Sequence, residues 1–177
     1  MNAAATSEGS EGQIDGARTG DREALASLYR THGAVLYRLA YRLTGTPQDA
    51  EDVVHDVFVG LPEALARYEE RGKWTSWLKR VTARVALVRL RARTRRREVP
   101  LELADQAARP PADPDATVLE SAVHALPDPL RIVVMLKEVE GYSHREVADL
   151  LGISVGASRV RAARALARLR KVLGDGR

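Results

Sequence analysis

The chain of 177 residues contains no cysteine, which excludes disulfide bridges, thiolate metal sites and cysteine nucleophiles together. Aromatic residues make up only 5% of the sequence, against 45% for hydrophobic residues of all kinds. No apolar run approaches the roughly 18 residues needed to span a bilayer, and the N-terminus lacks the basic and apolar segments of a secretion signal. Alanine, leucine and arginine dominate and favour helix. We therefore expect an all-α, cytoplasmic protein that is not inserted in a membrane.

Charge is sorted into blocks along the chain, although the net charge is only +4. Residues 71–97 hold eleven Lys or Arg and no acid, and residues 155–177 hold seven basic residues and one acid. Residues 49–70 hold seven acids and residues 98–120 hold six, each with a single Arg. Two basic surfaces separated by acidic ones predict two contacts with a polyanion and a separate partner for an acidic face.

Proline and glycine divide the chain into regions. Residues 1–20 are rich in Gly, Ser and Ala without periodicity and predict a disordered N-terminal arm. Apolar residues at helical spacing follow over 21–97, which predicts an N-terminal helical bundle. Four prolines within 98–116 predict an extended, acidic linker, which could reach about 60 Å. Residues 117–177 again show helical punctuation, so the expected fold is two small helical domains on a proline-rich tether.

The C-terminal domain carries the pattern of a helix-turn-helix. Ser143 and Glu146 form a capping box that opens a short predicted helix over 144–151. A tight turn at 152–154, which contains a glycine, leads into a long helix over 155–173. A short helix, a three-residue turn and a second helix are how helix-turn-helix units are built.

The long last helix has two predicted faces. We expect its apolar face to pack on the preceding helix through Val155, Ala162, Leu166, Leu169 and Leu173. The opposite arc carries small and basic residues, namely Ala157, Val160, Arg161, Arg164, Arg168 and Lys171. Small residues let the backbone approach bases, and arginines reach guanine edges or phosphates. The plainer alternative is a solvated basic face on an ordinary bundle helix.

Three of the eight aromatic residues, Tyr68, Trp74 and Trp77, lie within ten positions at the edge of the first basic block. A cationic stripe follows them, formed by Lys73, Arg80, Arg84 and Arg91. Aromatic rings beside cations suit single-stranded nucleic acid, because rings stack on unpaired bases while cations follow the backbone. Trp77 fits the apolar core stripe of its helix, which leaves Trp74 as the better candidate for base contact.

The acidic segment predicts one helix that runs from residue 47 to about residue 65. Asp52 and Asp56 lie opposite its apolar stripe, where they would repel DNA. Acids in the first turn also stabilise the helix dipole, which is a sufficient structural reason for them. A metal site built from Asp52, His55 and Asp56 is an alternative, but no second cluster supplies further ligands.

Three stretches together resemble the extracytoplasmic-function (ECF) group of bacterial RNA polymerase sigma factors, over residues 21–173. DAEDVVHDVF (49–58) is similar to the family's helix that docks on the clamp of the largest polymerase subunit. WTSWLKRVTARVALVRLR (74–91) is similar to the helix that recognises the minus-ten element. The stretch from LPDPLRIVV to ALARLR (126–170) is similar to the domain that reads the minus-thirty-five element.

The resemblance implies a transcription initiation factor without enzymatic activity or cofactor, which binds core polymerase and directs it to duplex and melted promoter DNA. It implies a region 2-like domain over 21–97 and a region 4-like domain over 117–177, which also contacts the polymerase flap. An anti-sigma factor is a further candidate partner. The residues that the resemblance implies for polymerase docking are Asp49, Asp52, His55 and Asp56. The minus-ten set is Lys73, Trp74, Ser76, Trp77, Arg80, Arg84 and Arg91. The minus-thirty-five set is Arg145, Ser154, Gly156, Ala157, Ser158, Arg159, Arg161 and Arg164.

The sequence departs from the family at positions that bear on base preference. Asn is frequent where Arg84 stands, and Asp or Asn where Val88 stands. Ser158 and Val160 stand where Val and Ser are frequent, which leaves the rotation of the last helix open. His55 replaces a common Gln.

Two other functions remain open on the residues alone. One is a stand-alone helix-turn-helix regulator that binds duplex DNA as a dimer. The other is a metal-dependent hydrolase of nucleic acids that uses the carboxylates between Asp49 and Asp56.

Overall fold

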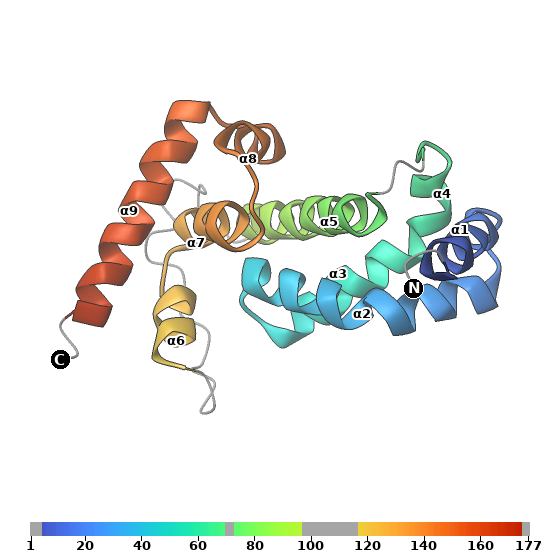
Figure 1. Ribbon diagram of the computed structural model, residues 1–177. Coiled ribbons are helices and arrows are strands. Elements are labelled where there is room, and N and C mark those ends of the chain that lie inside the picture. Colours follow the sequence, from blue (N-terminus) through green and yellow to red (C-terminus); the bar gives the residue numbers. More distant parts are fainter. Residues whose placement is uncertain (1–4, 70–72, 97–116, 175–177) are drawn as a thin grey trace. The chain divides into compact units, whose positions relative to one another are not determined.

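The computed structural model describes residues 5–69, 73–96 and 117–174, and all regular structure within these ranges is helical (Figure 1). The all-α prediction is therefore confirmed for this part of the chain. The helices group into two compact units, one of Met1–Ala40 and Pro47–Ala86, the other of Tyr41–Thr46 and Leu87–Arg177. The predicted linker over 98–116 lies outside the described residues.

The first unit contains α1 (Ala5–Arg18), most of α2 (Arg22–Thr44), α3 (Pro47–Val59), α4 (Leu61–Leu65) and the first part of α5 (Trp74–Arg96). Its core is aliphatic and comes from every one of these helices. The side chains with almost no exposure include Leu28, Leu36, Leu39, Val53, Val57, Leu61, Leu65 and Leu78. Their spacing of three or four residues along each helix is the pattern that amphipathic helices bury.

The prediction of disorder over residues 1–20 is wrong for the described part of this segment. α1 packs against α4, and Ile14 and Ala17 are buried. Arg18 anchors the end of α1, because its guanidinium donates to the backbone carbonyl of Leu65 at 3.2 Å and to that of Tyr68 at 3.3 Å. Two apolar residues and one arginine in a Gly-rich segment give too weak a periodic signal, so tertiary contacts decide its structure.

The single acidic helix predicted up to residue 65 is also wrong. α3 ends at Val59 and α4 begins at Leu61, with Gly60 between them. Pro62 supplies the physical reason, since a proline nitrogen has no hydrogen to donate to the carbonyl four residues before it.

The second unit contains α6 (Val118–His124), α7 (Asp128–Val134) with a π-helical turn (Met135–Val139), α8 (His144–Leu151) and α9 (Val155–Gly174). The predicted capping box at Ser143 is present, with the backbone amide of Glu146 donating to the Ser143 hydroxyl at 3.2 Å and the Ser143 amide donating back to the carboxylate at 2.9 Å. The helix boundaries that depend on such local caps are therefore where the sequence puts them.

A buried arginine on α7 holds the second unit together. Arg131 is only 2% exposed and donates to Asp128 Oδ1 at 2.7 Å and to the carbonyls of Leu43 and Thr44 at 3.2 and 3.3 Å. Burial lowers the pKa of the Arg131 guanidinium, and the neighbouring Asp128 carboxylate opposes that shift. Buried charges of this kind persist only when paired and hydrogen-bonded.

Candidate nucleic-acid and protein interfaces

The turn between α8 and α9 has the geometry that a helix-turn-helix requires. α8 ends at Gly152, whose φ of 67° lies in the left-handed region that glycine adopts without steric cost. The hydroxyl of Ser154 accepts from the backbone amide of Ala157 at 3.0 Å, so this serine caps the start of α9. Ser154 was predicted to contact DNA; its hydroxyl has this structural partner, and the residue is exposed.

The rotation of α9 differs from the prediction. Its buried residues are Ser158, Ala162, Ala165 and Leu169, whereas Val155 and Leu173 are exposed. At about 100° per residue, the buried stripe is turned by roughly 40° from the predicted one. The Ser158 hydroxyl lies 3.0 Å from His144 Nδ1 on α8. Ser158 was predicted to contact DNA, but it is fully buried between the two helices.

The outward face of α9 is basic, as predicted. Gly156, Arg159 and Arg164 are exposed, and Ala157 and Arg161 are partly exposed. Arg145 is exposed on α8. Apart from Ser158, the residues predicted for the minus-thirty-five element therefore have side chains or backbone accessible from outside the second unit.

The aromatic cluster predicted in the first unit forms, although its members exchange roles. Trp74 stacks on Trp77 with ring centroids 5.3 Å apart and an interplanar angle of 25°, and Tyr68 packs on both rings at 5.5 and 4.5 Å. Trp74 is only 8% exposed, whereas Trp77 is half-buried. Trp74, predicted as the better candidate for base contact, is therefore the more buried ring, and Trp77, predicted for the core, offers the more open face.

His32 on α2 is a partner of this cluster that the sequence did not reveal. The indole Nε1 of Trp74 donates to His32 Nε2 at 2.9 Å, and the two rings meet edge to face at 6.0 Å. Burial lowers the pKa of His32, which favours the neutral imidazole that can accept this bond. Because the two residues are 42 positions apart, no local motif links them.

The predicted minus-ten cations divide between the two units. Lys73, Ser76 and Arg84 are exposed and Arg80 is partly exposed, all in the first unit. Arg91 belongs to the second unit, where its guanidinium donates to the carbonyl of Leu151 at 2.9 Å. The structure thus gives Arg91 a role in capping the C-terminal end of α8, which the sequence pattern does not indicate.

The acidic face of α3 lies at the surface of the first unit. Asp52 and His55 are exposed, and Asp49 and Asp56 are partly exposed. His55 Nδ1 lies 3.8 Å from Asp56 Oδ1. Within residues 5–69, 73–96 and 117–174, no three His, Asp or Glu side chains gather as metal ligands, so the alternative of a metal-dependent hydrolase gains no support from this cluster.

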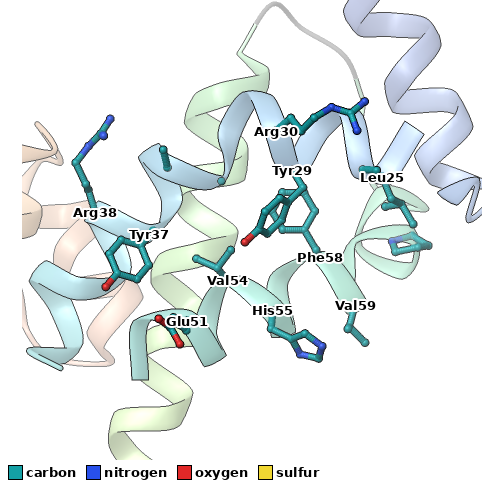
Figure 2. A pocket seen from close by; sticks show the side chains of 14 residues that line it. Leu25, Tyr29, Arg30, Tyr37, Arg38, Glu51, Val54, His55, Phe58 and Val59 are labelled. Atoms are coloured by element: carbon teal, nitrogen blue, oxygen red, sulfur yellow. The ribbon is translucent and has the colours of Figure 1, made fainter. Parts of the chain in front are cut away.

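An apolar groove that the sequence analysis missed runs between α2 and α3, with a volume of about 1060 Å³ (Figure 2). Tyr29 and Phe58 meet edge to face at 5.1 Å in its wall. Its polar rim includes Arg30 and Arg38 from α2 and Glu51 from α3. The groove is therefore continuous with the acidic helix, and two of its lining residues, Val59 and Tyr29, are exposed hydrophobic side chains.

None of the described helices combines the length and the apolar character needed to cross a membrane. The described helices form one unit with an aromatic and basic helix and another with a helix-turn-helix, an arrangement typical of helical proteins that bind nucleic acids.

Comparison with known proteins identifies the family. The family model of Sigma-70 region 2 matches residues 28–96, and that of Sigma-70 region 4 matches residues 117–169. ECF RNA polymerase sigma factor SigM of Mycobacterium tuberculosis is 33% identical over 159 residues, which cover 88% of this chain and 80% of SigM. SigE of Mycolicibacterium smegmatis is 34% identical over 170 residues, and the match spans 65% of its length and 88% of this chain. The chain belongs to the ECF family of RNA polymerase sigma factors, which are transcription initiation factors.

Two solved structures share the fold. The sigma factor RpoE of Bartonella quintana, in complex with the anti-sigma factor NepR, superposes with a TM-score of 0.59 at 23% identity, covering 86% of this chain and 97% of RpoE. CnrH, in complex with the cytosolic domain of CnrY, gives a TM-score of 0.55 at 28% identity, covering 92% of this chain and 96% of CnrH.

Proposed function

We propose that the chain binds core RNA polymerase through α3 and the groove beside it. The acidic side chains Asp49, Asp52 and Asp56, with His55 among them, complement a basic partner surface such as the clamp of the largest subunit. The apolar groove supplies area that a partner side chain can bury, at about 25 cal/mol per Å². Charge sets orientation and association rate, while the apolar contact adds affinity.

We propose that α5 and the residue before it capture the melted minus-ten strand. Trp77 offers a partly open ring for an unpaired base, and stacking contributes about 1–3 kcal/mol per base. Lys73, Arg80 and Arg84 follow the phosphate backbone, and Ser76 adds a polar contact. Trp74 is buried, so it stabilises the orientation of the Trp77 ring rather than touching a base.

We propose that α9 reads the minus-thirty-five element in the major groove. Gly156 and Ala157 let the backbone approach the base edges, while Arg159, Arg161 and Arg164 reach bases or phosphates. Arg145 on α8 adds a backbone contact. If about six cations across the promoter meet phosphates, binding falls with salt at a log–log slope near −5.

The assignment of functions to the domains follows the two matched regions. We propose residues 21–97 as the region 2-like domain, 98–116 as the linker toward the polymerase active site and RNA exit, and 117–177 as the region 4-like domain, which also meets the flap. The factor performs no chemistry of its own and acts in the cytoplasm. An anti-sigma factor is a proposed regulator, since both solved relatives are complexes with other proteins and RpoE is bound to an anti-sigma factor.

The observation that carries the proposal is the outward basic face of α9, set by a capped turn and a buried stripe on the opposite side. The test is transcription in vitro with purified core polymerase, promoter DNA and this chain, followed by mapping of start sites. Specific initiation that requires the chain supports the proposal. Binding of operator DNA that is equally tight with and without polymerase, with no initiation, would instead indicate the stand-alone regulator.

A further inference from the structure

Val160 is an aliphatic side chain on the cationic face of α9, and it is 50% exposed. The buried stripe of α9 is formed by Ser158, Ala162, Ala165 and Leu169. At about 100° per residue, Val160 lies roughly 170° from the centre of that stripe. It is therefore the position of the second helical turn that points most directly away from the core of its own unit.

The observed rotation of α9 is accompanied by a buried polar contact with α8. The hydroxyl of Ser158 lies 3.0 Å from His144 Nδ1, between α8 and α9. A buried hydroxyl needs such a partner, and turning α9 by the 40° of the sequence-based prediction would remove it. Val160 is on the outward face in either rotation, and the observed rotation turns it almost directly opposite the buried stripe.

The neighbours of Val160 leave its methyl groups free to touch a ligand. One turn toward the N-terminus lie Gly156 and Ala157, and a Cβ built on Gly156 would meet nothing closer than the Ser154 hydroxyl at 3.8 Å. Helical side chains tilt toward the N-terminus, so Val160 overhangs these two small residues. Arg164, one turn farther along the helix, is exposed on the same face, and the adjacent Arg159 is exposed beside it.

We propose that Val160 reads a thymine methyl group in the duplex minus-thirty-five element. The inference rests on the proposed function, in which the N-terminal half of α9 enters the major groove. An aliphatic side chain cannot hydrogen-bond to a base edge, and the one apolar group that the major groove displays is the C5-methyl of thymine. The N-terminal residues of a recognition helix are those that reach base edges, and Val160 is in the second turn. The flanking arginines would hold the helix on phosphates or guanines beside that thymine.

The test begins with the holoenzyme, formed from core polymerase and the full chain, and a promoter library randomised over the minus-thirty-five element. Each thymine of the selected element, on either strand, is then replaced by deoxyuridine, which removes only the methyl group. We expect one position at which this change weakens promoter binding about four-fold, the factor that corresponds to about 0.8 kcal/mol for one buried methyl.

Two variants make the assignment specific. Val160→Ala should bind the thymine promoter about as weakly as the parent protein binds the deoxyuridine promoter, and it should no longer distinguish the two bases. Val172→Ala is the matched control, because Val172 is 54% exposed on the same helix but lies three turns farther from the N-terminus. It should keep the parent's discrimination.

The outcomes separate this inference from the function it rests on. A selected element at which no thymine is sensitive to loss of its methyl, or at which Val160→Ala keeps the sensitivity, overturns the inference and leaves the proposed function standing. A selection that yields no preferred minus-thirty-five sequence, with no initiation above that of core polymerase, overturns the proposed function and this inference with it.

Discussion

The hydrogen bond from Trp74 to His32 leads to a prediction about acid sensitivity. An indole nitrogen can only donate, and an imidazole nitrogen can accept only while the ring is neutral. Protonation of His32 would therefore set two donors against each other across the 2.9 Å between Trp74 Nε1 and His32 Nε2. Burial is the cause of the lowered pKa of His32, so the neutral ring persists at neutral pH.

The direction of the pH effect follows from linkage. In the unfolded chain His32 has its ordinary pKa of about 6.5, and in the folded chain its pKa is lower. The unfolded chain therefore binds the proton more readily, and stability rises with pH across this interval. The contribution is fully present above about pH 6.5 and is lost as the pH falls through the folded-state pKa.

The perturbation is His32→Ala, which leaves the buried indole donor without its acceptor. The expected cost is about 1–3 kcal/mol. His32→Gln is the matched variant, because an amide oxygen can take the position of Nε2 and does not titrate. It should retain much of the stability at pH 7.5 and lose less than the parent protein on acidification to pH 5.5.

Urea unfolding followed by tryptophan fluorescence measures these effects, since both tryptophans of the sequence lie in this cluster. His55→Gln is the control, because His55 is exposed and should behave as the parent protein at both pH values. The reasoning is refuted if His32→Ala is as stable as the parent, or if His32→Gln loses as much stability on acidification as the parent does.

Three further predictions address the other surfaces. Reversing charge with Asp52→Lys and Asp56→Lys should weaken core polymerase binding at least about ten-fold, or roughly 1.4 kcal/mol, with an unchanged circular dichroism spectrum; normal holoenzyme assembly would contradict the docking assignment. Replacing Arg161 and Arg164 by Ala should cost about 1–3 kcal/mol for each arginine that contacts a base, or reduce the salt slope by about one for each that contacts a phosphate. Polymerase binding should stay intact, and unaltered promoter affinity would argue against this face. Arg131→Ala should destabilise the second unit by about 1–3 kcal/mol, because the buried carbonyls of Leu43 and Thr44 lose their donor, while Asp128 keeps its ion pair with Arg93 at 3.0 Å; an unchanged urea midpoint by circular dichroism would exclude that role.

Sequence patterns predicted the features that depend on neighbours three or four residues apart. The Ser143 capping box involves residues within one helical turn, so it could be read directly. The glycine at 152 marks the end of α8 for the same reason, because its left-handed conformation is local.

The features that could not be predicted depend on contacts between distant segments. α1 packs against α4, and its residues Ile14 and Ala17 are buried, but no pattern within the segment shows this. The rotation of α9 depends on His144, which gives the polar Ser158 a buried partner. Periodicity alone favoured Val155 as the buried residue, since a hydrophobic pattern scores a serine as an outward position.

The exchange of roles between the two tryptophans has an energetic consequence for the proposed capture of a melted base. A ring that is free to rotate loses conformational freedom when a base stacks on it, and each ordered side chain costs about 0.5–1.5 kcal/mol on binding. Trp77 already stacks on Trp74 and packs on Tyr68, and Trp74 is in turn fixed by His32. A base that reaches Trp77 therefore meets a ring whose orientation is set before binding, and more of the stacking energy remains to offset the cost of unpairing the promoter.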